Sequence, residues 1–554
     1  MFFIVSPSLK VQINLSPYRS SGNRRSFLKK ASAFGLLWST HRVNAQQMPG
    51  MNMPAPSSAS VRTTTPPRVP RLVASSLASF VDPLPMPEVL RPNAAGHVRV
   101  TMREVHAKLH RDLPPTRLWS YGNTQLAPLL EAHSGHPLRV EWMNQLPTKH
   151  FLPVDFSLHG CGHDVPEVRA CVHMHGGRTP SADDGQPEDW YVPGHSRVCT
   201  YPLEQDATAL WYHDHAMGLN RLNTYAGLFG MTIVRDHVED ALKLPSGRYE
   251  VPLLLCDRLL TTDGQLFYPD SGDSNHPWVP EFAGDAILAN GKIRPYLEVE
   301  PRLYRIRLLN AANSRFFNLA LSNKQAFHQI GSDQGLLSAP VELHKLTIAP
   351  AERADLLIDF SKAAGQQIVL RDNFFDVMQF RVAKKASSGQ ARTMPQALRT
   401  IERIPETSAI KTRTLSLNEF DDQYGNSMLM LIDRKHWHEP VTEKVKLNTT
   451  EIWEFANLTE DTHPMHLHLV RFQVLDRRAF DEFTFGHQNV MRYQAAAIPP
   501  EPQERGWKDV VQCLPGMVTR IIVNFDGYPG KYLYHCHVLE HEANDMMRPF
   551  EVIA

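Results

Sequence analysis

The chain has 554 residues, more than a single hydrophobic core supports and enough for three domains of ordinary size. Lysine plus arginine equals aspartate plus glutamate at 58 each, so the formal net charge is zero. This balance argues against a nucleic acid or an anionic membrane surface as a partner. The 42 prolines and the scarcity of long amphipathic patterns favour a β-rich protein with many loops.

The first 45 residues have the features of an export signal. The segment Asn23-Arg24-Arg25-Ser26-Phe27-Leu28-Lys29 matches the twin-arginine pattern, a short apolar run follows it, and Ala45 ends a stretch suited to cleavage. The apolar run is too short to cross a bilayer. A cytoplasmic protein with an incidental Arg-Arg pair is the alternative. We expect residues 1–45 to be a twin-arginine signal peptide, and the mature chain to be periplasmic or secreted without a membrane anchor.

The rest of the chain divides by composition. A leader rich in Pro, Ser and Thr has no core-forming pattern, so we expect disorder there, although its methionines could bind Cu(I). Alternating apolar residues, such as Leu138, Val140 and Trp142, predict strands in three later blocks. The predicted segments are a leader at 46–70, blocks at 71–240, 245–385 and 411–554, and a linker at 386–410.

Pairs of the form His-x-His are more frequent than chance predicts. With 27 histidines in 554 residues, roughly one pair is expected, and the chain has five. On a strand, each pair directs both imidazoles to one side, as a site with several metal ions requires. The five pairs are His173/His175, His213/His215, His436/His438, His466/His468 and His535/His537.

The pair His436/His438 is assigned to the surface. It follows the basic segment Asp433-Arg434-Lys435 and has no other ligand type nearby in the sequence. Metal ligation is the alternative for this pair. The other four pairs supply eight imidazoles, which suits three copper ions that share one pocket.

Cys536 lies between the histidines of the last pair and, on a strand, points to the opposite face. With His541 five residues on and Met546 ten residues on, it has the ligand set of a blue-copper site, which His463 completes. A buried or oxidised cysteine among incidental histidines is the alternative. A zinc site built from histidine alone would need neither Cys536 nor Met546.

Six cysteines are present, and if Cys536 binds a metal, at least one of the others is unpaired. Cys161 and Cys171 bracket a short loop and could form a disulfide, but spacing does not establish the geometry. The sequence leaves open the pairing among Cys161, Cys171, Cys199, Cys256 and Cys513.

With these motifs the chain resembles the bacterial multicopper oxidases, most closely the branch of spore-coat laccases and bilirubin oxidases. The resemblance runs from about Phe80 to Pro549. It is carried by Val81-Asp-Pro-Leu-Pro, His173-Met-His-Gly-Gly, Trp211-Tyr-His-Asp-His-Ala-Met, Asn290-Gly-Lys, Ala349-Pro-Ala-Glu-Arg, Trp507-Lys-Asp and His535-Cys-His-x-x-x-His-x-x-x-x-Met. It implies an all-β fold of three cupredoxin-like Greek-key barrels, with a trinuclear copper site between the first and third.

The resemblance also implies four copper ions: one of type 1, one of type 2 and two of type 3. The ligands it implies are His173 and His466 for type 2, His175, His213 and His535 for one type 3 ion, His215, His468 and His537 for the other, and His463, Cys536, His541 and Met546 for type 1. Met547 competes with Met546 for the axial position.

The activity implied is one-electron oxidation of phenols, aromatic amines or tetrapyrroles such as bilirubin, coupled through Cys536 to reduction of O₂ to water. The partners would be a small reducing substrate and O₂, and the chain would be a monomer. Reduction of O₂ consumes protons, so carboxylates near the cluster are expected. Glu542 and Asp184 stand where the family places acidic residues, and solvated surface carboxylates are the alternative for both.

Three other copper-protein functions are alternatives to a laccase-like oxidase. A metal oxidase acting on Cu(I) or Mn(II) would explain the methionines of the leader, but no long Met-rich insertion lies near the ligands of the third block. A copper-binding or storage protein would not need complete type 2 and type 3 ligand sets. A copper nitrite reductase is disfavoured because that family uses two-domain subunits. The donor would be selected by loops around type 1, which we expect to include residues 483–505.

Overall fold

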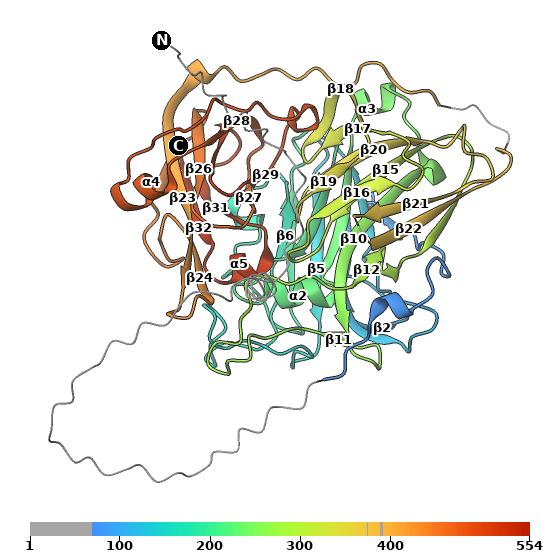
Figure 1. Cartoon of the computed structure of the whole chain (residues 1–554), viewed down its shortest axis with the longest axis horizontal. Coiled ribbons are helices and arrows are strands. Elements are labelled where there is room, and N and C mark those ends of the chain that lie inside the picture. The colour runs from blue at the N-terminus through green and yellow to red at the C-terminus, as the bar shows by residue number, and fades with distance from the viewer. Residues whose placement is uncertain (1–68, 374, 388–391) are drawn as a thin grey trace, which may run out of the picture. The chain divides into compact units, whose positions relative to one another are not determined.

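The computed structural model describes residues 69–373, 375–387 and 392–554. The predicted signal peptide and leader, apart from the last two residues of the leader, lie outside the described residues. Strands dominate the described part of the chain, and the helices are short (Figure 1). No helix among these residues is both long and apolar enough to cross a bilayer.

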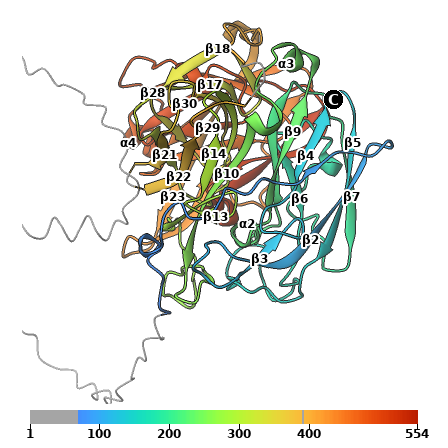
Figure 2. The same cartoon turned by 90° about the vertical axis from the view of Figure 1, so that its right-hand side faces the viewer.

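The first block forms two sheets, with strand orders β1-β4-β9-β8-β6 and β3-β2-β5-β7. Figure 2 shows β2, β3, β5 and β7 together at one side of this block. The strands are β1 (Val89–Leu90), β2 (His97–Ala107), β3 (Thr116–Ser120), β4 (Leu129–His133), β5 (Leu138–Gln145), β6 (Val172–His175), β7 (Ser196–Tyr201), β8 (Thr208–Asp214) and β9 (Phe229–Arg235). The helices are α2 (Asn220–Ala226) and α3 (His237–Ala241), with short 3₁₀ turns at Ala74–Ser76 and Ser181–Asp183.

The second block also forms two sheets, with orders β13-β12-β10-β15-β20-β17-β18, to which β11 adds beside β10, and β14-β22-β21-β16-β19. The strands are β10 (Glu250–Leu260), β11 (Leu266–Phe267), β12 (Ala286–Ala289), β13 (Lys292–Ile293), β14 (Tyr296–Val299), β15 (Leu303–Asn310), β16 (Phe317–Leu321), β17 (Phe327–Ser332), β18 (Gly335–Leu343), β19 (Leu346–Ile348), β20 (Arg353–Asp359), β21 (Gln367–Asp372) and β22 (Phe375–Val382). A 3₁₀ turn at Gly247–Tyr249 precedes β10.

The third block repeats this plan, with orders β24-β23-β26-β30-β28 and β25-β32-β31-β27-β29. The strands are β23 (Ala409–Asp421), β24 (Ser427–Ile432), β25 (Glu443–Lys446), β26 (Thr450–Asn457), β27 (His463–Leu467), β28 (Phe472–Ala479), β29 (Val510–Cys513), β30 (Met517–Asn524), β31 (Gly530–Cys536) and β32 (Met547–Ile553). The helices are α4 (Glu482–Gln488) and α5 (Leu539–Ala543), with 3₁₀ turns at Glu406–Ser408 and Pro502–Glu504.

The all-β prediction with three cupredoxin-like units is confirmed, since each block consists of two packed sheets with few helices. Each sheet of the described residues draws its strands from one block, although β23 begins at Ala409, inside the predicted linker. The exact domain boundaries stay a prediction. Where it is described, the linker packs onto its surroundings: Leu398 is buried, and Arg399 forms an ion pair with Asp206 of the first block.

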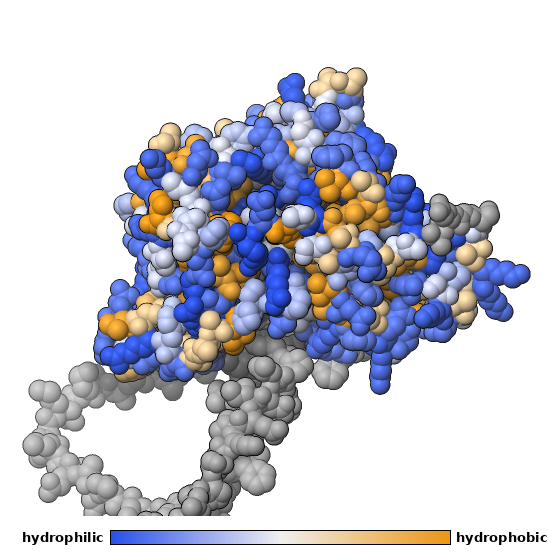
Figure 3. All heavy atoms as spheres, turned by 90° about the horizontal axis from the view of Figure 1, so that it is seen from above, coloured by the Kyte–Doolittle hydropathy of each residue, from blue (hydrophilic) through white to orange (hydrophobic). Residues whose placement is uncertain are grey.

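The buried apolar residues explain how the first and third blocks are held together. One large cluster is continuous from β5, β6 and β8 of the first block to β26, β27 and β31 of the third, whereas most of the second block has a core of its own. The metal-type histidines therefore lie where one core spans two blocks. On the outer face shown in Figure 3, hydrophilic and hydrophobic residues are interspersed, as is usual for a protein surface.

Candidate copper centres

Two antiparallel strands of the third block carry ligand-type residues on both of their faces. The register of β27 and β31 places Met465 opposite Cys536 and His466 opposite His535. Because side chains alternate along a strand, His463 shares a face with Cys536, while His466 and His535 point to the other face. One pair of strands thus serves two sites.

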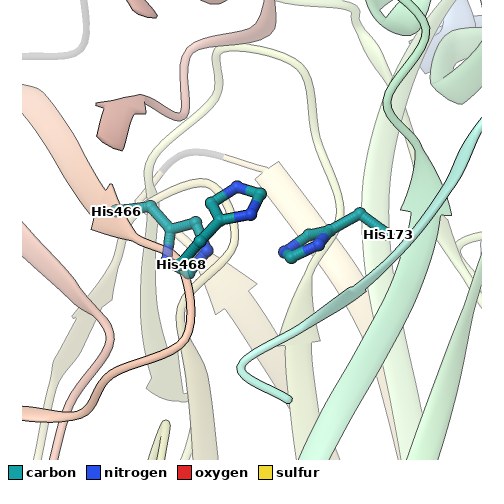
Figure 4. Close-up of side chains that lie close together, drawn as sticks. All are labelled: His173, His466 and His468. Carbon is teal, nitrogen blue, oxygen red and sulfur yellow. The ribbon is translucent and has the colours of Figure 1, made fainter. Parts of the chain in front are cut away.

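The first of these sites is a pocket of eight histidines between the first and third blocks. In the first block, β6 and β8 pair with His173 opposite His213. Figure 4 shows the imidazole of His173 directed across the pocket at His466 and His468 of the third block. All eight side chains are fully buried: His173, His175, His213, His215, His466, His468, His535 and His537.

The ring nitrogens of this pocket have the properties of metal ligands. Burial lowers the pKa of His175, His213 and His466 well below its ordinary value, and the neighbouring imidazoles add to this shift. The rings are therefore neutral and keep a lone pair. Buried nitrogens without a hydrogen bond among the described residues are costly unless an ion binds them. They are His173 Nε2, His175 Nδ1, His213 Nε2, His215 Nδ1, His466 Nε2 and both nitrogens of His537.

Hydrogen bonds on the opposite nitrogen fix which atom each ring presents. Nδ1 of His173 donates to the backbone carbonyl of Asp184 at 2.6 Å, and Nδ1 of His466 donates to that of Asp509 at 2.8 Å. Because a carbonyl only accepts, Nδ1 holds the proton and Nε2 keeps the lone pair. Both rings therefore present Nε2 to the pocket, as a shared ion requires.

His175 is oriented the other way, by a carboxylate. Its Nε2 lies 3.1 Å from Asp509 Oδ1, which leaves Nδ1 free on the pocket side. Asp509 is itself held by the guanidinium of Arg353, with Nη1 at 2.7 Å from Oδ1, and by the amide of Gln334 at 2.5 Å from Oδ2. A buried arginine of the second block thereby orients a histidine of the first through a carboxylate of the third.

The grouping of the type 3 ligands differs from the prediction. His535 was grouped with His175 and His213, but its Nε2 lies 3.1 Å from His468 Nε2 and 3.5 Å from His215 Nε2. The ring of His537 lies 5.0 Å from that of His175 and 5.2 Å from that of His213. The predicted grouping is therefore wrong. Residues two positions apart in an extended segment are separated by about 6.6 Å, so His535 and His537 reach different ends of the pocket. Sequence spacing alone does not tell which of the two histidines lies at which end.

The two histidines predicted to bind the type 2 ion lie farther apart than the rings grouped above. The rings of His173 and His466 lie 5.8 Å apart, and His468 stacks on His173 at 3.9 Å. The Nε2 atoms of His173 and His466 remain without hydrogen-bond partners among the described residues. These two rings thus keep the donor atoms that the prediction requires.

The second site lies on the other face of the strand pair. Sγ of Cys536 lies 3.5 Å from Nδ1 of His463 and 3.7 Å from Nδ1 of His541, and these two nitrogens are 3.2 Å apart. Nε2 of His463 is held at 2.7 Å by the hydroxyl of Thr459. Burial raises the pKa of the Cys536 thiol, so a thiolate here needs a bound cation. The set of one sulfur and two imidazole nitrogens suits a blue copper ion.

Met546 is better placed than Met547 as the fourth ligand of this site. Its backbone nitrogen donates to the carbonyl of His541, and its carbonyl accepts from the nitrogen of Cys536, each at 3.0 Å. Its side chain belongs to the same buried cluster as that of Cys536. The side chain of Met547 instead packs in a separate cluster, with Met217, Trp437 and Leu533.

Comparison with known proteins agrees with this geometry. Models of the multicopper oxidase family match residues 164–239 and 407–554, which contain both clusters. The chain is 45% identical over 508 residues to a laccase of Bacillus subtilis, which covers 86% of this chain and 99% of that protein, and 36% identical over 519 residues to a laccase of Haloferax volcanii, with 86% of each chain covered. A crystal structure of laccase from Pediococcus acidilactici superposes with a TM-score of 0.71 at 27% identity, covering 86% of this chain and 95% of that one.

This chain belongs to the multicopper oxidase family. It is a copper-dependent, laccase-like enzyme, and the predicted resemblance to bacterial laccases is confirmed. The donor sets described above suit copper, because imidazole and thiolate are ligands that copper prefers.

Two carboxylates of this oxidase reach the pocket of eight histidines as predicted. Oε1 of Glu542 lies 3.3 Å from His215 Nε2, and its Oε2 lies 3.2 Å from His535 Nδ1. Oδ2 of Asp184 accepts from His468 Nδ1 at 2.8 Å, and burial raises the pKa of Asp184. Both are 1% exposed, so the alternative of solvated surface carboxylates is wrong. Their role in proton supply stays a prediction.

Sequence reasoning missed two residues that touch the ligands, Glu281 and Asp509, and a third, Glu540, that positions the helix carrying His541. Oε2 of Glu281, on the loop between β11 and β12, lies 3.2 Å from Nε2 of His541. Asp509 was noted only as part of a motif, and Glu540 was not noted. The buried carboxylate of Glu540 anchors α5 to the second block, accepting hydrogen bonds from Tyr268, Asn313 and Ser314 at 2.6, 2.8 and 2.6 Å. The contacts of Glu281 and Glu540 left no signal in the sequence, because their partners come from distant segments.

One possibility that the sequence left open is excluded. All six cysteines are free buried thiols, so Cys161 and Cys171 do not form the disulfide that their spacing allowed. The expectation that residues 483–505 lie beside type 1 stays a prediction: the 3₁₀ turn at Pro502–Glu504 packs against β17 and β18 of the second block, whereas Phe485 and Met491 pack with Leu458 of the third. The described contact at the outer nitrogen of His541 comes from Glu281.

Proposed function

We propose that this oxidase couples the one-electron oxidation of phenols, aromatic amines or tetrapyrroles such as bilirubin to the four-electron reduction of O₂ to water. One observation carries the proposal: Cys536 faces one cluster, and its covalent neighbours His535 and His537 face the other. The mononuclear and trinuclear sites are thus linked by a few covalent bonds of one strand.

We further propose four copper ions per chain. When bound, they would take single electrons at the type 1 site and reduce O₂ at the type 2 and type 3 sites. The proposed ligands are His463, Cys536, His541 and Met546 for type 1, His173 and His466 for type 2, His175, His213 and His537 for one type 3 ion, and His215, His468 and His535 for the other.

Glu281 has a role in donor selection in this proposal. Its carboxylate touches the outer nitrogen of His541 and its side chain is 28% exposed, so a donor that reaches His541 meets it. An ionised carboxylate only accepts hydrogen bonds. Donors with a phenolic hydroxyl or an amine are therefore favoured over those without such a group.

Glu542 and Asp184 move protons in this proposal. Each lies within 3.3 Å of histidine nitrogens of the pocket. A carboxyl group at that distance can hold a proton close to the place where O₂ is reduced. Burial favours the protonated form of Asp184, which suits a proton donor.

The cellular setting is proposed from the sequence alone. Residues 1–45 would direct twin-arginine export, and the mature oxidase would be a periplasmic or secreted monomer. The size of the purified mature protein in solution and its first residue, read by N-terminal sequencing, test this. A mature chain that still begins at Met1 would contradict cleavage.

The activity is tested by O₂ uptake of the purified, copper-loaded protein with a methoxyphenol, bilirubin or Cu(I) as the donor. We expect uptake with the organic donors at four electrons per O₂, without peroxide. Cys536→Ser, which lacks the thiolate, is the matched control and should show no uptake. O₂ uptake with Cu(I) but with neither organic donor would overturn the proposal in favour of a metal oxidase. No uptake with any donor would indicate a copper carrier.

A further inference from the structure

A third group of histidines lies outside both copper centres. The pair His436/His438, assigned to the surface by sequence, meets His159 of the first block and Asp545 of the loop after α5. The four residues come from three segments that are far apart in the sequence, and they meet only in the folded chain.

The carboxylate of Asp545 organises this group. Its Oδ1 lies 3.0 Å from Nδ1 of His159, and its Oδ2 lies 2.8 Å from Nδ1 of His436. An ionised carboxylate only accepts, so Nδ1 of each ring carries the proton and Nε2 keeps the lone pair. His468 is held in the same way in the trinuclear pocket, with its Nδ1 2.8 Å from Asp184. Carboxylates commonly orient metal-binding histidines in this manner.

The position of Asp545 is itself set by the fold. Its side chain is only 8% exposed, although the two histidines that it holds are 33% and 43% exposed. Its backbone lies in the left-handed region with φ at 69°, which is uncommon for a residue other than glycine. The carboxylate is thus a fixed, buried base beneath partly exposed rings.

His438 adds a third imidazole at a suitable spacing. Its ring centre lies 5.8 Å from that of His159 and 5.7 Å from that of His436. Rings that share a proposed type 3 ion lie at 5.8 Å (His175 and His213) and 5.0 Å (His175 and His537), so the distances of His438 fall at the upper end of this range. The side chain of His438 is exposed, so it can turn toward an ion without moving the core.

We propose that His159, His436 and His438, oriented by Asp545, bind one divalent transition-metal cation such as Zn²⁺ or Cu²⁺ on the surface. Imidazole nitrogens favour these ions, whereas Mg²⁺ and Ca²⁺ take oxygen ligands. The site is additional to the copper centres of the proposed function and uses none of their ligands.

Zinc binding to the copper-loaded holoenzyme, prepared without a histidine tag, tests this proposal. Isothermal titration with Zn²⁺ should give one site per chain, which excess Mg²⁺ does not fill. His438→Ala and His436→Ala should each weaken binding at least tenfold while the copper content stays unchanged. His438 is exposed, so its variant tests the site without disturbing the core.

The matched control is His133→Ala/His136→Ala, which removes another exposed pair of histidines, with ring centres 6.4 Å apart. This variant should bind Zn²⁺ as the unaltered protein does. The proposal is overturned if the holoenzyme takes up no Zn²⁺, or if the control loses binding while His438→Ala keeps it. Because the readout is zinc occupancy, a failure here leaves the oxidase proposal untouched.

Discussion

The two copper centres of this oxidase are built in different ways, although they share one pair of strands. The proposed type 1 ligands all come from the third block, within residues 463–546, and Glu281 at its outer edge is partly exposed. The eight-histidine pocket takes four histidines from the first block and four from the third, and all are buried. The type 1 ligands are also buried, so the two sites differ at their edges: we call the type 1 site the open site because Glu281 beside it is partly exposed, and the eight-histidine pocket the closed site.

The difference also extends to the supporting groups. At type 1, the outer nitrogens of His463 and His541 meet a hydroxyl and a carboxylate. In the eight-histidine pocket, four backbone carbonyls and the buried carboxylates hold the rings, and Asp509 connects the pocket to Arg353 of the second block. Substitution of one type 1 ligand should therefore disable the open site and leave the closed site intact. The closed site is held in place by residues of all three blocks.

The largest effect is expected from Cys536→Ser. A serine hydroxyl does not replace the thiolate, so the blue absorption should vanish and turnover should fall by about a thousandfold or more. The copper content should fall by one ion per chain, while the ions proposed for the eight-histidine pocket stay. Absorption spectra and metal analysis check this, and a blue, active variant would contradict the type 1 assignment.

Glu542→Gln should act on the closed site alone. The amide keeps the shape but cannot pass on a proton, so turnover should fall about a hundredfold. The blue colour and the copper content should persist, because Glu542 contacts His215 and His535 but not Cys536 in the described structure. Turnover equal to that of the unaltered enzyme would remove Glu542 from the proton path.

Glu281→Leu should weaken the binding of donors at the edge of the type 1 site. Loss of one charged hydrogen-bond acceptor should raise KM for a methoxyphenol roughly five- to tenfold. Donors without a hydroxyl or amine should be much less affected, which separates donor recognition from a change in the copper itself. Equal losses for both kinds of donor would argue against the selective role.

The smallest effect on turnover is expected at a buried histidine outside the copper centres, which acts on the stability of the fold instead. Burial lowers the pKa of His150 to about 4, and its neutral ring accepts from the nitrogen of Leu152 at 2.9 Å and lies 3.2 Å from Asn223. In the unfolded chain the pKa is about 6.5, so the unfolded state binds more protons between pH 6.5 and 4. The free energy of unfolding should therefore be highest above pH 6.5 and fall as pH drops to 4, by on the order of 3 kcal/mol from this residue.

Urea unfolding of the copper-free protein at pH 7 and pH 4.5 checks this, with His150→Gln as the comparison. The variant is less stable at pH 7 but should lose less stability on acidification. An unchanged pH dependence would show that His150 titrates normally in the folded protein.

Much of the site could be predicted because strand alternation is a local rule. The opposite directions of Cys536 and of His535 and His537 follow from their order in the chain. The end of the pocket that each of these two histidines reaches depends on the packing of β31 against two blocks, and this prediction was wrong. Local order decides the face of a strand, and tertiary packing decides the neighbour.

Contacts between distant segments could not be predicted from the sequence, because they too depend on tertiary packing. Glu281 meets His541 across 260 residues, and Arg353 meets Asp509 across 156. The pair His436/His438 lacked nearby ligands in the sequence because Asp545 lies 109 residues beyond His436. The fold class was easier to predict, since repeated alternation and many prolines leave few options other than packed sheets.

The split origin of the eight-histidine pocket also sets an order of events during synthesis. His173, His175, His213 and His215 leave the ribosome about 250 to 290 residues before His466, so for that interval they form only half of a site. An ion captured then would lack the partners that give the finished pocket its selectivity. Correct metal loading must therefore wait until translation is complete, and slowing the synthesis of the third block in copper-rich or zinc-rich medium should increase the share of wrongly metallated chains.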